Sequence, residues 1–516
     1  MNGADLLCDA LLAQGVELCF ANPGTSEMHF VAALDRKPKL RCVLGLQEGV
    51  VTGAADGYGR MADKPAATLL HTGPGLANGL VNLHNARRGH TPMINVVGDH
   101  AAYHLVHDAP LTSDIDTLAR PMSKWQRRIA GAGTIAEDAA AAWRAALELR
   151  GPATLILPAD AAWGEIAAAV PVPVPAPVPP APAAEALETA AALLTSGRRC
   201  GLIMTGRALR ADALETAGRI AAATGAELYS QMSNARMERG AGRVPVTRIP
   251  YPVDQALALL GHLEVAILVG AADPVAFFAY PGKPSRLLPE ACALHRLAAI
   301  TDDLPGALSS LAEAVGAGRA TPLRAQRADP AEGLPDGALT ADAVCTLVAR
   351  RLPENCIVVD ESVSSGRVFY KLSASAPPHD YLQLTGGAIG EGIPLATGAA
   401  VACPDRKVIN LEADGSGLYS AQGLWTQARE GLDVVTVVFA NRAYAILQGE
   451  MRNVGVNAFG RNAERMLSLD EPPVDWVALA RGFGVEAARA TTVEEFAKLF
   501  EGALSTRGPF LIECLT

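Results

Sequence analysis

Residues 408–417 read VINLEADGSG, an apolar run that ends at an acidic turn containing two glycines. A helical pattern follows at 420–429, and a second apolar run lies at 434–439. Short buried strands that alternate with helices are typical of a parallel sheet covered by helices on both faces. Ligands bind such sheets at the carboxyl ends of the strands. Because Asp414 lies at one of these ends, the segment indicates both a fold class and the position of a site.

The same alternation extends over the rest of the 516 residues, which are too many for one domain. We interpret as buried strands the apolar runs at 66–70, 93–97, 153–157, 201–204, 265–269 and 356–359. The proline-rich segment 171–182 (PVPVPAPVPPAP) and the polar segment 326–337 interrupt the pattern. We therefore predict three doubly wound parallel-sheet α/β domains in series, over 1–170, 183–325 and 338–516, joined by two linkers.

The composition excludes several classes of protein. Half of the residues are hydrophobic, 19% are charged, and the formal net charge is −10. This is unlike a disordered chain, and an acidic chain without a basic cluster is a poor nucleic-acid or membrane-surface binder. No apolar run reaches the ~18–20 residues of a membrane span. The nine cysteines form no C-x-x-C pair, which favours reduced thiols in a cytoplasmic protein over a zinc site.

Two polar residues follow neighbouring strands of the last third. Asp414 ends the first apolar run, and Asn441 comes just after the run at 434–439. A carboxylate and an amide at adjacent strand ends can converge on one Mg²⁺ ion, which prefers oxygen ligands. Such an ion would hold a diphosphate without a basic patch. Taken alone, the Asp-Gly pair is also compatible with a simple Asx turn.

The segment Asp414-Gly415-Ser416, followed by Asn441, resembles the thiamin diphosphate motif, in which Gly-Asp-Gly precedes Asn-Asn by 25–30 residues. Ala413 and Ala440 replace the first glycine and the first asparagine of that motif. The two residues that bind the metal in the family are both present.

The first third carries further motifs in the order of the same superfamily. They are NPGTSE at 22–27, CVLGLQEGVV at 42–51 with Glu48, AADGYGRM at 54–61 and HTGPG at 71–75. The resemblance spans nearly the whole chain. It is strongest to acetolactate synthase large subunits and benzoylformate decarboxylases, and it implies pyrimidine-binding, central and diphosphate-binding domains in that order.

The resemblance also implies a set of site residues. Mg²⁺ would be bound by the Asp414 and Asn441 side chains and by the Ala443 carbonyl. The cofactor would be contacted by Glu48, Ser364, Gly387, Ile389, Asp414, Gly415, Ser416, Asn441 and Tyr444. Ile389 would lie under the cofactor and force its two rings into a V.

Glu48 is the expected catalytic carboxylate. It lies in an apolar stretch, which raises a carboxyl pKa and favours proton sharing with the aminopyrimidine ring of thiamin. That contact would promote loss of the proton on C2 of the thiazolium, the reactive carbon of the cofactor. Without the resemblance, Glu48 is equally compatible with a solvated strand end, and Ile389 with an ordinary core position.

His71 bears on the reaction type. It follows the strand at 66–70, as in thiamin-dependent decarboxylases, although a purely structural histidine is the alternative. The stretch 275–282 lacks the second histidine of benzoylformate decarboxylase, and Phe277 or Phe278 takes its place. A site that protonates its product poorly favours transfer to a second carbonyl. The substrate pocket is expected to include Ser26, His71, Phe278 and Ile446.

The sequence therefore predicts an acetolactate-synthase-like carboligase, a transferase that acts on a 2-oxo acid such as pyruvate. The alternatives are a benzoylformate-decarboxylase-like lyase and an inactive regulatory relative, which the intact Glu48, Asp414 and Asn441 disfavour. The resemblance implies a homodimer as the minimum active unit, usually within a homotetramer. FAD is not expected, because the central third lacks a dinucleotide fingerprint.

Overall fold

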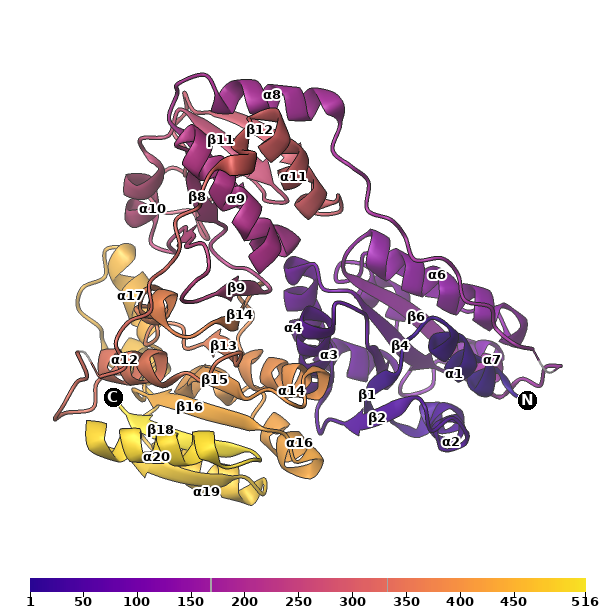
Figure 1. Ribbon diagram of the computed structural model, residues 1–516. Helices are drawn as coiled ribbons and strands as arrows, with labels where there is room; N and C mark the ends of the chain where they lie inside the picture. Colours follow the sequence, from indigo (N-terminus) through magenta and orange to yellow (C-terminus); the bar gives the residue numbers. More distant parts are fainter. Residues whose placement is uncertain (168, 332) are drawn as a thin grey trace.

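The computed structural model describes residues 1–167, 169–331 and 333–516, and it contains three sheets (Figure 1). The N-terminal sheet has the order β2-β1-β3-β4-β6-β5. Its strands are β1 (Leu18–Asn22), β2 (Arg41–Leu44), β3 (Ala67–Leu70), β4 (Met93–Asp99), β5 (Trp125–Arg128) and β6 (Pro152–Pro158). Its helices are α1 (Gly3–Ala13), α2 (Met28–Arg36), α3 (Glu48–Ala62), α4 (Thr72–Gly89), α5 (Ile115–Ala119), α6 (Ile135–Glu148) and α7 (Ala159–Trp163).

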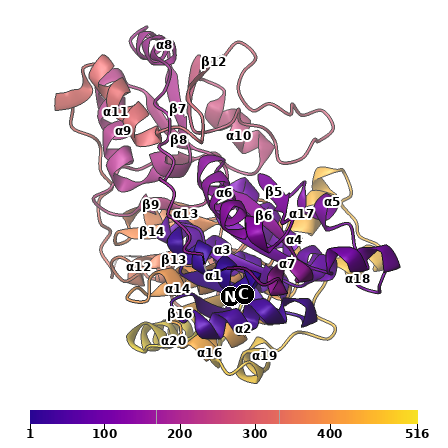
Figure 2. The same cartoon turned by 90° about the vertical axis from the view of Figure 1, so that its right-hand side faces the viewer.

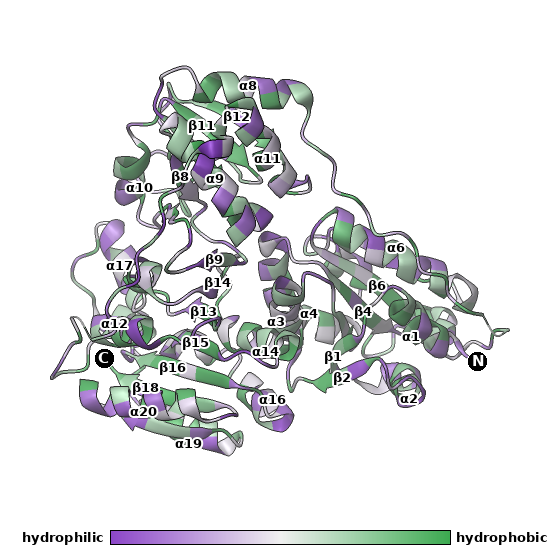
Figure 3. Ribbon diagram, viewed as in Figure 1, coloured by the Kyte–Doolittle hydropathy of each residue, from purple (hydrophilic) through white to green (hydrophobic). Residues whose placement is uncertain are grey.

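The central sheet has the order β10-β8-β7-β11-β12 and lies above the other two domains in both ribbon views (Figure 2). Its strands are β7 (Cys200–Met204), β8 (Glu227–Ser230), β10 (Thr247–Arg248), β11 (Val265–Val269) and β12 (Ala293–Ala298). Its helices are α8 (Ala184–Leu194), α9 (Ala211–Thr224), α10 (Val253–Leu260) and α11 (Leu304–Ala314). β11 is hydrophobic along its length, whereas α9 has two faces, as expected for a covered sheet (Figure 3).

The C-terminal sheet has the order β17-β18-β16-β15-β13-β14-β9. Its strands are β9 (Met237–Arg239), β13 (Ile357–Glu361), β14 (His379–Gln383), β15 (Val408–Ala413), β16 (Val434–Ala440), β17 (Glu486–Ala490) and β18 (Phe510–Leu515). Its helices are α12 (Ala341–Arg351), α13 (Phe369–Leu372), α14 (Gly392–Ala402), α15 (Asp414–Gly417), α16 (Gly423–Glu430), α17 (Ala445–Asn453), α18 (Arg461–Leu467), α19 (Trp476–Gly482) and α20 (Val493–Ser505).

The predicted fold class is confirmed, with one addition. β9 comes from the central part of the chain, yet it pairs antiparallel with β14 at the edge of the C-terminal sheet. The other strand pairs within the three described sheets are parallel. The C-terminal sheet therefore takes one edge strand from the central part of the chain, and its other strands all come later in the sequence.

Helices α3 and α14 join the first and last domains. A Cβ atom on Gly57 would lie 2.0 Å from the carbonyl oxygen of Leu395, and one on Gly398 would lie 1.8 Å from that of Ala54. The two backbones approach this closely only because both positions are glycine. Residues of both helices belong to one buried hydrophobic cluster, so the two domains share a core.

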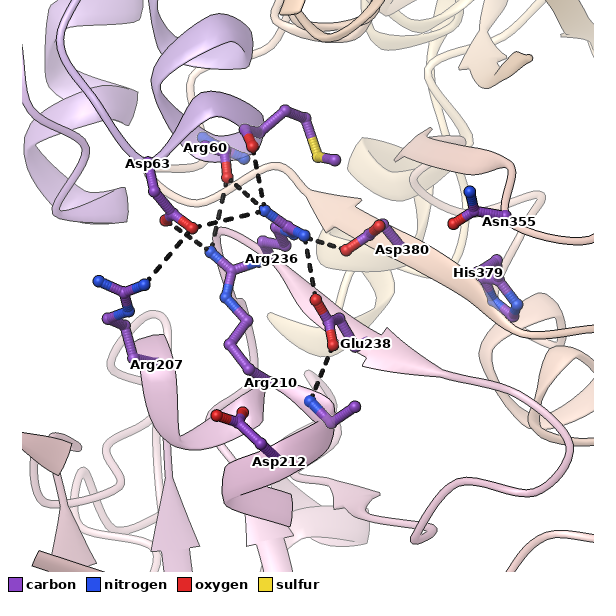
Figure 4. Close-up of polar contacts among 12 residues, drawn as sticks. Arg60, Asp63, Arg207, Arg210, Asp212, Arg236, Glu238, Asn355, His379 and Asp380 are labelled. Atoms are coloured by element: carbon purple, nitrogen blue, oxygen red, sulfur yellow. Dashed lines mark hydrogen bonds and ion pairs between the residues drawn. The ribbon is translucent and has the colours of Figure 1, made fainter. Parts of the chain in front are cut away.

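Ion pairs fix the place where the three domains meet (Figure 4). Arg236, just before β9, pairs with Asp380 of β14 and with Glu238 of β9. Arg210, just before α9, donates to Asp63 at the end of α3 over 3.1 Å. These contacts link the central segment to both neighbouring domains.

A cavity of about 650 Å³ opens at the same junction. It is lined by side chains of both charge signs, among them Arg150, Arg207, Asp212 and Asp303. None of the residues that the sequence predicts to contact a cofactor lines it. Separately, no helix in the described ranges is both long enough and apolar enough to cross a membrane.

Candidate functional site

Glu48 is the first residue of α3, not the end of a strand. β2 ends at Leu44, and Gln47 caps the helix by accepting a hydrogen bond from Val50. The Glu48 residue is only 9% exposed, and Asn78 of α4 donates its Nδ2 to Glu48 Oε2 over 3.0 Å. A carboxylate in the first turn is favoured by the amide dipoles of the helix. The Glu48 carboxylate is therefore buried, and one of its oxygens is held by a hydrogen bond.

His71 lies at the carboxyl end of β3, as expected, and precedes α4. Its Nδ1 lies 2.8 Å from Glu27 Oε2 and 3.2 Å from Ser26 Oγ. Glu27 is 2% exposed and also accepts from the backbone N–H of Gly24 over 2.8 Å. With Nδ1–H donated to this carboxylate, Nε2 is the nitrogen left for a ligand.

Three glycines make room for these side chains. A Cβ on Gly24 would lie 2.2 Å from His71 Cγ, and one on Gly98 would lie 1.8 Å from Glu27 Oε1. A Cβ on Gly75 would lie 3.1 Å from Glu48 Oε1. Packing therefore explains why NPGTSE has glycine at position 24 and why HTGPG has glycine at position 75, since a larger residue would crowd His71 or Glu48.

Asp414 and the 441–443 segment lie together at the ends of the paired strands β15 and β16. Asp414 accepts from the backbone N–H groups of Gly415 (2.8 Å) and Arg442 (2.6 Å). Asn441 Oδ1 accepts from the N–H of Ala443 over 2.9 Å. Burial raises the pKa of Asp414 to about 6, because the carboxylate has left water.

The donor set fits a hard cation. Among the described residues, no side-chain nitrogen forms an ion pair with Asp414, and the Arg442 guanidinium pairs with Asp470 instead. No cluster of three or more His, Cys, Asp or Glu side chains that could hold a metal is found in the described ranges. A metal here would therefore depend on one carboxylate with amide and carbonyl oxygens, which is an Mg²⁺-type environment.

The other predicted cofactor contacts surround this point. The ring of Tyr444 lies over Gly415, where a Cβ would be 2.6 Å from the Tyr444 Cε1 atom. Ser416 is buried in α15, the helical turn that begins at Asp414. Ser364 lies in the turn after β13, in which Val363 has a φ of 48°, a strained value for a β-branched residue.

The glycine loop before α14 carries Gly387 and the half-buried Ile389. A Cβ on Gly387 would lie 2.5 Å from Phe277 Cζ, so Phe277 packs on this loop. Phe278 is adjacent but 56% exposed, and Ile446 is a half-buried residue of α17. Phe277, which is 43% exposed, therefore contacts the loop, whereas the residue predicted for the substrate pocket is its neighbour Phe278.

The predicted residues form two groups within one chain. Glu48, His71 and Ser26 belong to the N-terminal domain, whereas Asp414, Asn441 and Tyr444 lie at strand ends that lead into α15 and α17.

Sequence reasoning misses Glu27, Asn78 and Asn85. Glu27 bonds to His71, Asn78 bonds to Glu48, and Asn85 bonds to the backbone next to Ile389. Asn78, Asn82 and Asn85 recur at a spacing of four and three residues. This spacing places them on one face of α4, and it is the signal that could have identified them.

Comparison with known proteins identifies the family. Residues 1–119 match the model described as the N-terminal TPP binding domain of thiamine pyrophosphate enzymes, and residues 364–514 match the C-terminal TPP binding domain. The protein named "Putative acetolactate synthase large subunit IlvX" of Mycobacterium tuberculosis is 49% identical over 99% of this chain and 98% of its own length.

Two decarboxylases are also similar along the whole chain. Benzoylformate decarboxylase of Pseudomonas aeruginosa is 29% identical over 98% of this chain and 97% of its own. The structure of the thiamine diphosphate-dependent 4-hydroxybenzoylformate decarboxylase of Rhodococcus jostii RHA1 superposes with a TM-score of 0.86, at 26% identity, over 100% of this chain and 99% of that one. The resemblance seen in the motifs is confirmed: the chain belongs to the thiamine pyrophosphate enzyme family.

Proposed function

We propose that the chain is a thiamin diphosphate- and Mg²⁺-dependent carboligase. It would decarboxylate a 2-oxo acid such as pyruvate and transfer the acyl unit to a second carbonyl compound, as acetolactate synthases do. The choice of a carboligase over a lyase rests on Phe277 in the place of a second histidine, whereas the observation that carries the dependence on thiamin diphosphate is the geometry of Glu48. Asn78 occupies one oxygen of this buried carboxylate, and among the described residues no group hydrogen-bonds to the other, which is left for the aminopyrimidine ring.

The residues of the chain would divide the work. Asp414, Asn441 and the Ala443 carbonyl would hold Mg²⁺ and through it the diphosphate. Gly387, Gly415, Ser416, Ser364 and Tyr444 would border the cofactor, and Ile389 would support it from below. Glu48 would hold the proton that the ring exchanges. When bound, the thiazolium supplies the sink for the electrons released as carbon dioxide leaves.

A benzoylformate-decarboxylase-like lyase is the second candidate, and the His71–Glu27 contact favours it. A histidine whose Nδ1–H is held by a buried carboxylate can present Nε2 to the substrate and move a proton there. The packing of Phe277 on Gly387 opposes it, because an aromatic ring in this stretch cannot donate a proton. An inactive regulatory relative is disfavoured by the retained Glu48, Asp414 and Asn441.

The arrangement supports a homodimer as the minimum unit and a homotetramer as the assembly. Glu48 begins α3 of the N-terminal domain and Asp414 begins α15 of the C-terminal domain. In the family the matching residues act on one cofactor from different subunits, so one subunit would supply each to a shared cofactor.

FAD is not part of the proposal. A Cβ on Gly206 would meet Ile300 Cδ1 at 2.7 Å, and one on Gly270 would meet Leu304 Cδ1 at the same distance. These apolar side chains occupy the carboxyl ends of β7 and β11, where a dinucleotide would bind.

The proposal is tested by incubating the protein with thiamin diphosphate, Mg²⁺ and a panel of 2-oxo acids, with and without aldehyde acceptors. Carbon dioxide release and product identity are measured together. A 2-hydroxy ketone formed in proportion to carbon dioxide supports the carboligase. Free aldehyde in that proportion, without coupled product, replaces it with the lyase. No release from any acid favours the regulatory relative.

A further inference from the structure

We propose that Asn85 and Glu361 are positioning residues that clamp the backbone on either side of Ile389. This inference rests on the proposed function and deepens it, because Ile389 is the residue expected to support the bent cofactor. Neither residue would touch the cofactor itself.

Asn85 holds the residue before Ile389. Its Nδ2 donates to the carbonyl oxygen of Ala388 over 2.8 Å, and its Oδ1 accepts from the N–H of Ala388 over 3.2 Å. Asn85 is fully buried on α4 and also donates to Asn82 Oδ1. One side chain of the N-terminal domain thus satisfies both backbone groups of Ala388, as a neighbouring strand would.

Glu361 holds the residues after Ile389. Its Oε1 accepts from the N–H of Gly390 over 2.7 Å, and its Oε2 accepts from the N–H of Gly392. Glu361 is the last residue of β13 and is 2% exposed. On the opposite side of the same residue, Asn82 Nδ2 lies 3.4 Å from the Gly390 carbonyl oxygen.

Ile389 is the one residue between the two clamps. The loop around it needs them, because Gly387 and Gly390 have φ values of 79° and 91° and glycine adopts many other conformations at little cost. The hydrogen bonds from Asn85 and Glu361 hold the backbone on both sides of Ile389 in one conformation. They would therefore fix the direction of the Ile389 side chain. Preorganisation of this kind removes a conformational cost when the cofactor bends.

The test uses the holoenzyme and compares Asn85→Ala and Glu361→Gln with the unmodified protein. The readouts are the rate of C2 proton exchange on bound thiamin diphosphate in D₂O, the near-ultraviolet circular dichroism of its ring tautomers, the Kd for the cofactor and the unfolding midpoint. We expect both variants to slow C2 exchange by about 10- to 100-fold and to change the tautomer signal, since misplacing a reacting group has this effect.

Asn95→Ala is the matched control. Asn95 is also a fully buried asparagine with two side-chain hydrogen bonds, to Thr68 and Thr154, but it lies inside the N-terminal sheet. The Asn95→Ala substitution should lower the unfolding midpoint, because it removes two buried hydrogen bonds. It should leave C2 exchange in the folded enzyme within about twofold of the unmodified rate, because these bonds lie inside the sheet and away from Ile389.

Each outcome decides the question. Unchanged exchange and tautomer signals in Asn85→Ala and Glu361→Gln, with a lowered midpoint, would assign both residues a purely structural role and overturn the inference. Failure of both variants to fold, when Asn95→Ala folds, would overturn it in the same way. If the unmodified protein does not bind thiamin diphosphate, the proposed function fails first, which is a distinct result.

Discussion

The carboxylate of Glu48 has one oxygen bonded to Asn78 and belongs to the first turn of α3. Glu48→Gln keeps the shape of this side chain but removes its ability to take up a proton. We expect the variant to bind thiamin diphosphate normally and to lose about 100- to 10,000-fold in C2 exchange and in turnover, the usual range for a general acid–base group. Calorimetric titration and C2 exchange measure the two properties separately. Glu17→Gln, at an exposed position, is the control and should keep normal turnover. Full turnover in Glu48→Gln would refute the assignment of Glu48 as the group that exchanges a proton with the cofactor.

His379 gives a prediction about stability and pH. It is fully buried, its Nδ1 donates to the Pro377 carbonyl over 2.7 Å, and burial lowers its pKa from 6.5 to about 3. Below pH 6.5 the imidazole of His379 is therefore protonated in the unfolded chain but stays neutral in the folded chain. The free energy of unfolding falls as the pH drops through this window, by about 2 kcal/mol at pH 5.

His379→Asn retains a donor toward Pro377 and cannot be protonated, so it should lose this part of the pH dependence. Urea unfolding at pH 5 and pH 7 measures the difference between the two pH values for each variant. His107→Gln, at an exposed position, should keep the full dependence. If His379→Asn and the unmodified protein lost the same unfolding free energy between pH 7 and pH 5, the prediction would be contradicted.

Candidate site residues could be selected from the sequence, but their hydrogen-bond partners could not. Glu48, His71, Asp414 and Asn441 stand in recognisable motifs, and each lies where an apolar run or a helix begins or ends. The action of Asn85 on residue 388 could not be predicted, because some 300 residues separate them in the chain and only tertiary packing brings them together. A single sequence contains no signal for such a pairing.

At the scale of secondary-structure elements, the crossing of α3 and α14 is sensitive to substitution at its glycines. In Gly57→Ala the added methyl group would meet the backbone oxygen of Leu395 at 2.0 Å, and a backbone atom cannot move aside cheaply. We expect a loss of about 2–3 kcal/mol in the free energy of unfolding, as for overpacked cores. The urea midpoint measures it.

Gly502→Ala is the matched control in another helix. Gly502 is exposed in α20, and a methyl group added there would meet no atom within 4 Å. This substitution should be neutral or should stabilise by about 0.5–1 kcal/mol. If Gly57→Ala behaved like Gly502→Ala, the two helices would not be packed as closely as described.

The strands that could be predicted, such as β4, β11 and β16, are predominantly apolar runs, and β9 shows the limit of that rule. Met237-Glu238-Arg239 is short and contains two charged residues. It becomes a strand because β14 offers an open edge and because Arg239 stacks on the Tyr370 ring, 3.7 Å from its centre. The start of α3 is ambiguous for a related reason: the apolar residues around Glu48 suit a strand as well as a helix.

The whole molecule allows a test of the proposed assembly by mixing two inactive variants. Asp414→Ala should abolish cofactor binding, and Glu48→Gln should slow catalysis. If each active site takes Glu48 from one subunit and Asp414 from the other, a hybrid dimer contains one intact site. Co-refolded or co-expressed variants should then regain about one quarter of the normal activity, since half of the dimers are hybrids with one working site of two.

The control is a mixture of two preparations of the same variant, which should regain nothing. Sedimentation analysis establishes that the mixed sample is dimeric or larger. No recovery in mixtures proven to contain hybrids would mean that both groups act within one chain. A monomer with full activity would overturn the dimer outright.

The shared core of α3 and α14 has a consequence during synthesis. About 340 residues separate Gly57 from Gly398, so at roughly 5–20 residues per second the ribosome needs about 17–70 s to make the second helix after the first. Throughout that time the nascent N-terminal domain carries an apolar, glycine-lined helix face with nothing packed on it. The yield of folded protein in a cell therefore depends on how well this face is shielded until the last third of the chain has emerged.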